Sequence, residues 1–168
     1  MGGAIVQTLA LSHPEMIKGI VLVGTGARLK VFPMILNGIK DDFEKTVRQI
    51  NQFTYSRKVS PAFIERGIAE MLRCRPEVLY GDFLACDQFD LMNEIEKIVL
   101  PTLILCGDND QLAPLKYSQF LQSRIKGSKM EILPDAGHMV MMESPQLFNE
   151  KIREFIRELV KDSRILGK

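Results

Sequence analysis

Hydrophobic positions at the start of the chain predict one helix and one strand. Residues 2–12 are small or apolar on nearly every helical face, which predicts a helix buried between other elements. His13-Pro14 ends that helix. Residues 17–23 contain an unbroken apolar run at 20–23 and stop at a Gly-Thr-Gly sequence. This second segment predicts a strand buried on both faces, as in a parallel sheet.

Helical spacing then dominates a long middle segment. From residue 28 to about 80 the apolar residues recur at helical intervals, with Ser60-Pro61 as a cap and first turn. This spacing predicts a helical lid inserted after the first strand, and the helical pattern continues over residues 76–98. Residues 100–106 form another apolar run that stops at Gly107 and predicts a second buried strand.

The remainder of the chain alternates helix, strand and helix. Residues 113–125 predict a helix, residues 129–133 a third strand, and Ser144-Pro145 caps a final amphipathic helix that reaches residue 159. Because strands and helices alternate, we expect an α/β fold. Its three-stranded parallel sheet would be flanked by helices and joined by right-handed crossovers.

Composition and charge exclude several classes of partner. Of 168 residues, 46% are hydrophobic and 26% are charged, as in an ordinary folded domain. Lys and Arg number 22 against 21 for Asp and Glu, so the net charge offers no footprint for nucleic acid or an anionic membrane. The longest apolar stretches, residues 4–11 and 19–23, fall short of the roughly 20 residues that span a bilayer.

Cysteine usage points to a reducing compartment. Cys74, Cys86 and Cys106 are scattered without CxxC spacing, which favours reduced thiols in a cytoplasmic protein over a disulfide framework or a structural zinc site. The amino terminus carries no basic segment of the kind that opens a secretion signal. We expect neither a metal nor a cofactor.

Two loops that follow predicted strands carry ionisable residues. Asp108 and Asp110 follow the second strand, and Asp135 and His138 follow the third. Since neighbouring parallel strands end at one crevice, an acid from one loop can reach the imidazole from the next. A carboxylate bonded to one ring nitrogen fixes the tautomer and leaves the other nitrogen free as a general base.

Three short motifs resemble the α/β-hydrolase fold family. Residues 107–110 with Pro114 look like its acid loop, and Gly137-His138 with Glu143 and Pro145 looks like its histidine loop. Met1-Gly2-Gly3 looks like the second half of the family's G-H-S-M-G-G nucleophile elbow. The resemblance covers essentially the whole chain, residues 1–168, as a partial domain with the lid at about residues 28–80.

The resemblance implies a role for three residues. Asp110 is the triad acid, with Asp108 as the alternative, and His138 is the base. Met1 follows the nucleophile, so its backbone N–H contributes to the oxyanion hole. On this alignment the serine stands one residue before Met1, and the family's earlier strands also precede this chain. Cys106 ends a strand but leads into the acid loop, so it is not taken as the nucleophile.

Two functions follow from that reading. The first is a serine hydrolase of carboxylic esters or related acyl compounds, with a small-molecule acyl substrate in the full-length parent and no activity in this chain alone. The alternative is a non-catalytic remnant or an oligomerising interaction module. Residues 20–23 would form an exposed sheet edge, so we expect a homodimer or larger assembly that covers it.

Other polar and apolar residues near the motifs have structural interpretations. Asp135 shapes the turn before His138, and the Glu143 carboxylate interacts favourably with the positive end of the final helix. Residues 139–142, rich in methionine, either pack in the core or line an acyl pocket. The aromatic residues of the lid either bound a hydrophobic cleft or pack against one another.

Overall fold

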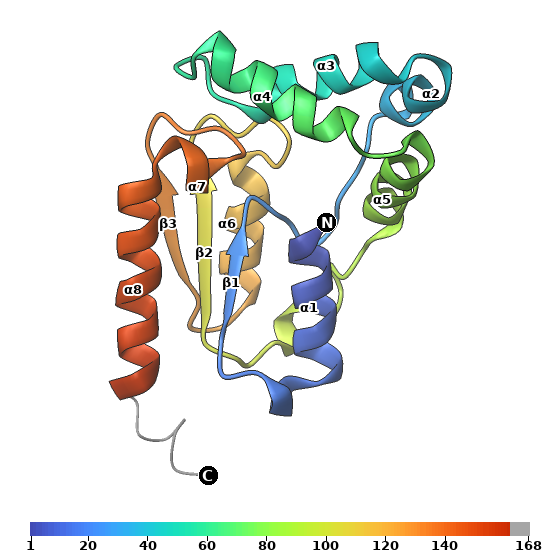
Figure 1. Cartoon of the computed structure of the whole chain (residues 1–168). Coiled ribbons are helices and arrows are strands. Elements are labelled where there is room, and N and C mark those ends of the chain that lie inside the picture. Colours follow the sequence, from blue (N-terminus) through green and yellow to red (C-terminus); the bar gives the residue numbers. More distant parts are fainter. Residues whose placement is uncertain (162–168) are drawn as a thin grey trace.

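The sheet has the strand number and direction that the sequence predicts. The computed structural model describes residues 1–161. Its strands are β1 (Ile20–Val23), β2 (Thr102–Gly107) and β3 (Lys129–Leu133), which lie in that order and are all parallel (Figure 1). All six residues of β2 are buried, because β2 has a strand on each side and helices on both faces. The α/β fold class is therefore confirmed.

One face of the sheet packs against α1 (Gly2–Ser12) and α6 (Leu115–Arg124). Ile20, Leu22 and Ile104 point to this face, because alternate residues of a strand point the same way. On the helix side, Ala10 and Leu121 complete the cluster. The prediction that α1 is buried on nearly every face is wrong: only Ala4, Gln7 and Ala10 are buried, and Ile5 on the outer side is 58% exposed.

The opposite face packs against α7 (Val140–Glu143) and α8 (Pro145–Lys161). Leu103, Leu105 and Leu133 supply the strand side of this cluster, and Val140 and Phe155 supply the helix side. Helices thus cover both faces of the sheet, and the carboxyl ends of all three strands emerge at one end of the layers (Figure 1).

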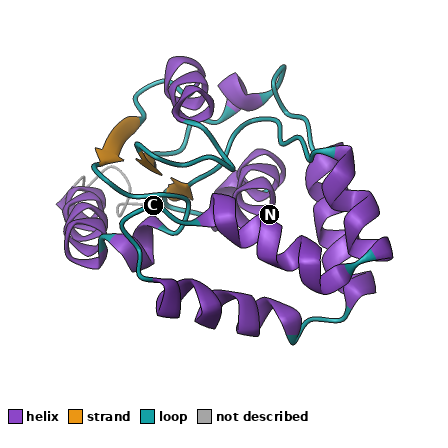
Figure 2. Cartoon of the chain, turned by 90° about the horizontal axis from the view of Figure 1, so that it is seen from above, coloured by secondary structure: helices purple, strands orange, loops and turns teal. Residues whose placement is uncertain are grey.

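A helical insertion, residues 33–88, joins β1 to the segment before β2. It consists of α2 (Pro33–Asp41), α3 (Phe43–Thr54), α4 (Pro61–Leu72) and α5 (Pro76–Gln88). The insertion has a core of its own, made of Ile35, Ile39, Val47, Ile50, Ile68 and Leu79. Its helices α2, α3 and α4 lie beyond the carboxyl ends of the strands (Figure 1), and Figure 2 shows the molecule from that end.

The segment that leads from the insertion back to the sheet differs from its predicted structure. The predicted helix over 76–98 is wrong beyond Gln88, where α5 ends. The returning chain there pairs with the outgoing chain: Arg28 bridges Asp90, and the Leu91 N–H donates to the Ala27 carbonyl at 2.7 Å. A 3₁₀ turn, η2 (Ile95–Lys97), follows, and another, η1 (Pro14–Met16), precedes β1. Within residues 1–161 no helix combines the length and apolarity needed to cross a membrane.

Candidate active site

The loop after β2 holds the carboxylate of Asp110 in one orientation. Asp110 Oδ1 accepts the backbone N–H of Leu112 at 2.9 Å and of Ala113 at 2.8 Å. The side chain is completely buried. An aspartate that accepts from N–H groups two and three residues ahead forms a local turn of its own, so the loop fixes the acid. The second oxygen, Oδ2, remains available to another segment.

That second oxygen contacts His138. The distance from His138 Nδ1 to Asp110 Oδ2 is 2.9 Å. This contact favours the tautomer with the proton on Nδ1, and it leaves Nε2 with a lone pair that can accept a proton. The His138 side chain is 30% exposed, whereas Asp110 is enclosed. Asp108 is exposed and accepts from the Asn109 side chain instead, so the structure brings together Asp110 and His138.

Two glycines allow the loops to lie this close. A Cβ on Gly107, where β2 ends, would overlap the carbonyl oxygens of Ala136 and Gly137. Gly24 follows β1 with a φ of 49°, and a Cβ there would lie 3.1 Å from His138 Nδ1 and 3.2 Å from Asp110 Oδ2. The loops after all three strands therefore meet at the acid–histidine pair.

The amino end of α1 lies at the same end of the sheet (Figure 1). Met1 caps α1, and its carbonyl accepts the N–H of Ala4 at 2.9 Å. A Cβ on Gly3 would collide with the Thr25 side chain, next to Gly24, and the Gln7 amide donates to the Gly26 carbonyl at 3.1 Å. The positive end of the helix thus adjoins the loop that touches His138. Within residues 1–161, however, no hydrogen bond joins Met1 to His138.

Among residues 1–161, the hydrogen bonds of the His138 ring involve only Asp110. No serine, threonine or cysteine side chain between residues 1 and 161 hydrogen-bonds to His138. Cys106 is fully buried, and burial raises the pKa of its thiol. A buried neutral thiol is a poor nucleophile, which agrees with setting Cys106 aside.

Glu143, for which the sequence predicts an interaction with the start of the final helix, instead accepts hydrogen bonds from two other segments. Glu143 Oε2 accepts the N–H of Gly137 at 3.0 Å and the N–H of Ser56 at 2.9 Å. Ser56 lies 87 positions earlier, in the connection between α3 and α4, so no local pattern could have indicated this contact. The neighbouring Thr54 carbonyl accepts the N–H of His138 at 2.9 Å.

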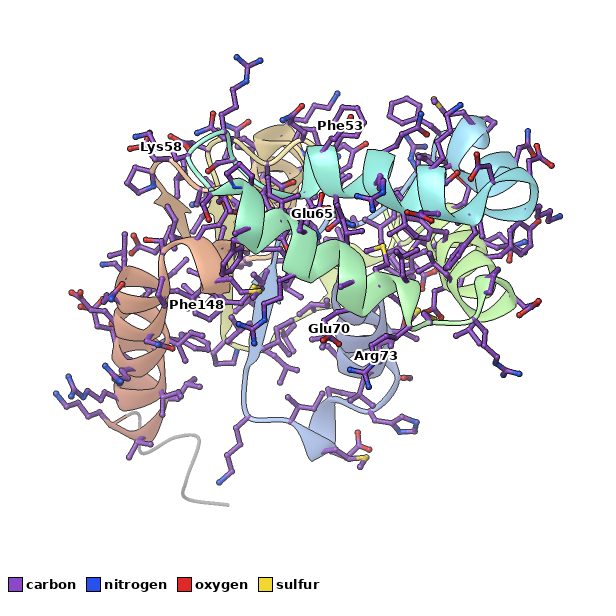
Figure 3. The ribbon with its side chains drawn as sticks, turned by 45° about the horizontal axis from the view of Figure 1, so that its top comes forward. Phe53, Lys58, Glu65, Glu70, Arg73 and Phe148 are labelled. Carbon is purple, nitrogen blue, oxygen red and sulfur yellow. The ribbon has the colours of Figure 1, made fainter. Side chains whose placement is uncertain are left out.

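The turn before His138 also forms an ion pair with the connection between α3 and α4. Asp135 adopts a φ of 60°, and its carboxylate lies 2.6 Å from the Lys58 ammonium. Figure 3 shows Lys58 at the end of the insertion nearest β3 and α7. Both side chains are mostly exposed. In the part of the chain that is described, no three His, Cys, Asp or Glu side chains gather as metal ligands.

Comparison with known proteins is consistent with this geometry. The profile of the alpha/beta hydrolase fold matches residues 1–145. The chain belongs to the α/β-hydrolase fold family. A pimeloyl-[acyl-carrier protein] methyl ester esterase of Neisseria meningitidis is 24% identical over 170 residues, which cover 93% of this chain and 66% of the relative. A 2-hydroxy-6-oxononadienedioate/2-hydroxy-6-oxononatrienedioate hydrolase of Klebsiella pneumoniae is 29% identical, with 93% and 59% covered.

A solved thermophilic esterase superposes on this family member with a TM-score of 0.86 at 38% identity, covering 94% of this chain and 63% of the esterase. An enol-lactonase from Burkholderia xenovorans has the same fold, with a TM-score of 0.86 at 21% identity; 94% of this chain and 63% of the lactonase are covered. The chain therefore spans about two thirds or less of the length of these relatives.

Proposed function

We propose that this chain supplies the acid and the base of a serine hydrolase that acts on carboxylic esters or related acyl compounds. The observation that carries the proposal is the 2.9 Å contact between His138 Nδ1 and Asp110 Oδ2, with Asp110 Oδ1 held by its own loop. An acid held in this way orients the imidazole and stabilises its protonated form. The 38% identity to a thermophilic esterase supports ester chemistry.

In the proposed reaction, His138 Nε2 removes the proton from a serine hydroxyl as its oxygen attacks the acyl carbon. The imidazolium then gives that proton to the departing alkoxide, leaving an acyl-enzyme. Water hydrolyses the acyl-enzyme by the same proton transfers in reverse. Met1, at the amino end of α1, would offer its backbone N–H to the oxyanion. The serine in this proposal belongs to a Gly-His-Ser segment directly before Met1.

We also assign the helical insertion the role of a lid over the acyl substrate. Its supporting contact is the Thr54 carbonyl, which accepts the His138 N–H at the carboxyl ends of the strands. Most apolar side chains of the insertion pack on one another, so the insertion has a core of its own.

The test compares residues 1–168 with a protein extended by the codons that precede Met1. We expect the extended protein to react stoichiometrically with a fluorophosphonate at the added serine and to hydrolyse a p-nitrophenyl ester. His138→Ala in the extended protein should lower kcat by about 10³-fold or more. Residues 1–168 alone should show neither labelling nor an ester burst. Stoichiometric labelling of a serine within residues 1–168, or full activity of His138→Ala, contradicts the proposal.

A non-catalytic role in self-association is a second candidate, and one face of the structure favours it. Strand β1 pairs only with β2, so its other edge has no neighbour among the described residues. Beside it, Met1, Ile5 and Leu9 of α1 are partly exposed and, with Phe89, border an apolar pocket of about 400 Å³. Unpaired edges and apolar patches promote association. Light scattering should find a dimer or larger species at micromolar concentration, and a stable monomer contradicts it.

A further inference from the structure

Three consecutive residues of the helical insertion lie directly against the histidine loop. The Thr54 carbonyl accepts the His138 N–H at 2.9 Å, and the Ser56 N–H donates to Glu143 Oε2 at 2.9 Å. Tyr55 stands between them and is buried. This strap, residues 54–56, is the segment through which the insertion touches the backbone of His138.

Glu143 bonds to both sides of this contact. The same Oε2 atom that accepts from Ser56 also accepts the N–H of Gly137, the residue before His138, at 3.0 Å. The two backbones are so close that a Cβ on Gly137 would lie 2.6 Å from the Ser56 nitrogen and 2.8 Å from the Tyr55 carbonyl carbon. One carboxylate oxygen therefore holds the strap and the histidine loop together.

The strap is in turn fixed to the helices of the insertion through Tyr55. Its ring packs edge-on against Phe63 of α4, with the centroids 5.7 Å apart, and its hydroxyl abuts Gly67. Burial, and then the charge of Glu143, raise the pKa of the Tyr55 hydroxyl, as expected for a ring enclosed beside a carboxylate. Tyr55 therefore connects α4 to the strap that Glu143 holds.

We infer that Glu143 is a positioning residue: it sets the imidazole of His138 against Asp110 by clamping the histidine loop to the strap. This inference deepens the proposed function, because it concerns the base of that reaction. Glu143 does not touch the reacting atoms. Its action runs through the N–H of Gly137 and the backbone of His138. Removing the carboxylate leaves two N–H groups without their acceptor in a closely packed place.

The experiment uses residues 1–168 and two pairs of variants. Glu143→Ala removes the acceptor, and Glu143→Gln keeps an oxygen that can accept both N–H groups. Glu150→Ala and Glu150→Gln are matched controls on the exposed side of α8. The first readout is the downfield proton resonance of His138 Nδ1–H. Only one other histidine, the exposed His13, is present in the sequence, which simplifies its assignment. The second readout is amide exchange at Ser56, Gly137 and His138.

In Glu143→Ala we expect the Nδ1–H resonance to be lost to exchange with water, and the three amides to exchange about tenfold faster or more. Glu143→Gln should stay within about threefold of the parent, and the Glu150 variants should match it. An unchanged Nδ1–H resonance and unchanged exchange in Glu143→Ala would overturn the inference.

A shorter carboxylate covers the case in which Glu143→Ala unfolds. Glu143→Asp keeps the charge but withdraws the oxygen by one methylene, so we expect a weakened Nδ1–H resonance while the amides of β2 stay protected. A full-strength resonance in Glu143→Asp overturns the inference. None of these readouts requires a nucleophile. The proposed function fails separately, when an extended protein with an intact Nδ1–H resonance does not hydrolyse esters.

Discussion

Two carboxylate groups near His138, those of Asp110 and Glu143, take their hydrogen bonds from different parts of the chain. Each accepts two backbone N–H groups. Asp110 takes both from Leu112 and Ala113, two and three residues further along its own loop. One oxygen of the acid is therefore oriented by two N–H groups of its own loop.

Glu143 takes its two N–H groups from segments 6 and 87 residues away. The contact with Ser56 exists only when the helical insertion is docked on the histidine loop. Both N–H donors to Asp110 thus lie in its own loop, whereas one donor to Glu143 comes from the helical insertion. Variants of the acid loop should therefore act on the pair itself, and variants at Glu143 should act on how the insertion and the pair are coupled.

The largest effect is expected at Asp110. Asp110→Ala removes the partner of His138 and leaves the N–H groups of Leu112 and Ala113 without their acceptor, which should destabilise the fold by about 3–5 kcal/mol. Asp110→Asn keeps an oxygen for Leu112 and Ala113, so we expect a smaller loss of about 1–2 kcal/mol. In an extended protein that carries the serine, Asp110→Asn should still lower kcat by about 10⁴-fold, because the amide favours the wrong tautomer.

Urea unfolding of the two variants, followed by ester hydrolysis in the extended protein, checks this separation of stability from chemistry. Equal stability losses in Asp110→Ala and Asp110→Asn would mean that the loop does not depend on the aspartate oxygen. The local account of the acid would then be wrong.

Features that depend on neighbouring residues could be predicted from the sequence. The acid loop was recognisable because the spacing of Asp110 from Gly107 and Pro114 is a local pattern. The third strand was predicted at its observed limits, Lys129–Leu133, as part of the alternation of helices and strands. Local chemistry decides these features, so the sequence carries them directly.

The contacts of Glu143 could not be predicted in this way. Its partner Ser56 stands in a connection between two helices, and nothing in either segment specifies the other. The end of α5 at Gln88 was missed for a related reason, because the chain stops being helical where Asp90 and Leu91 pair with the outgoing segment at residues 27–28. Helix α7 was also missed, since its four residues are too few for a periodic pattern.

The clamp can be disturbed without touching its carboxylate. Gly137→Ala places a methyl group 2.6 Å from the Ser56 nitrogen and 2.8 Å from the Tyr55 carbonyl carbon, neither of which can move freely. We expect a loss of about 2–3 kcal/mol. Gly81→Ala is the matched control, because a Cβ there meets nothing within 4 Å and lies inside helix α5. It should stabilise by about 0.5–1 kcal/mol. Thermal or urea unfolding distinguishes the two, and a neutral Gly137→Ala would show that the strap is loosely packed.

A smaller, pH-dependent effect should come from Tyr55. Its pKa is raised in the folded protein by burial and by the charge of Glu143. The unfolded chain ionises its tyrosine near pH 10, so stability is intact below about pH 10 and is lost as the pH rises toward the higher folded pKa, by up to about 1 kcal/mol over the first pH unit. Tyr55→Phe should remove this part of the loss. Unfolding at pH 8 and pH 10.5 measures it, and identical pH dependence in parent and variant contradicts it.

The smallest effect is expected at the outer contact between the insertion and the histidine loop. Lys58 and Asp135 form an ion pair at 2.6 Å, but their side chains are 68% and 61% exposed. Solvent screens such a pair, so Lys58→Ala should cost no more than about 0.5 kcal/mol. It should also leave the Nδ1–H resonance of His138 unchanged, because the clamp through Glu143 remains in place. If Lys58→Ala weakens that resonance as much as Glu143→Ala does, the surface charges carry the coupling and the Glu143 carboxylate does not.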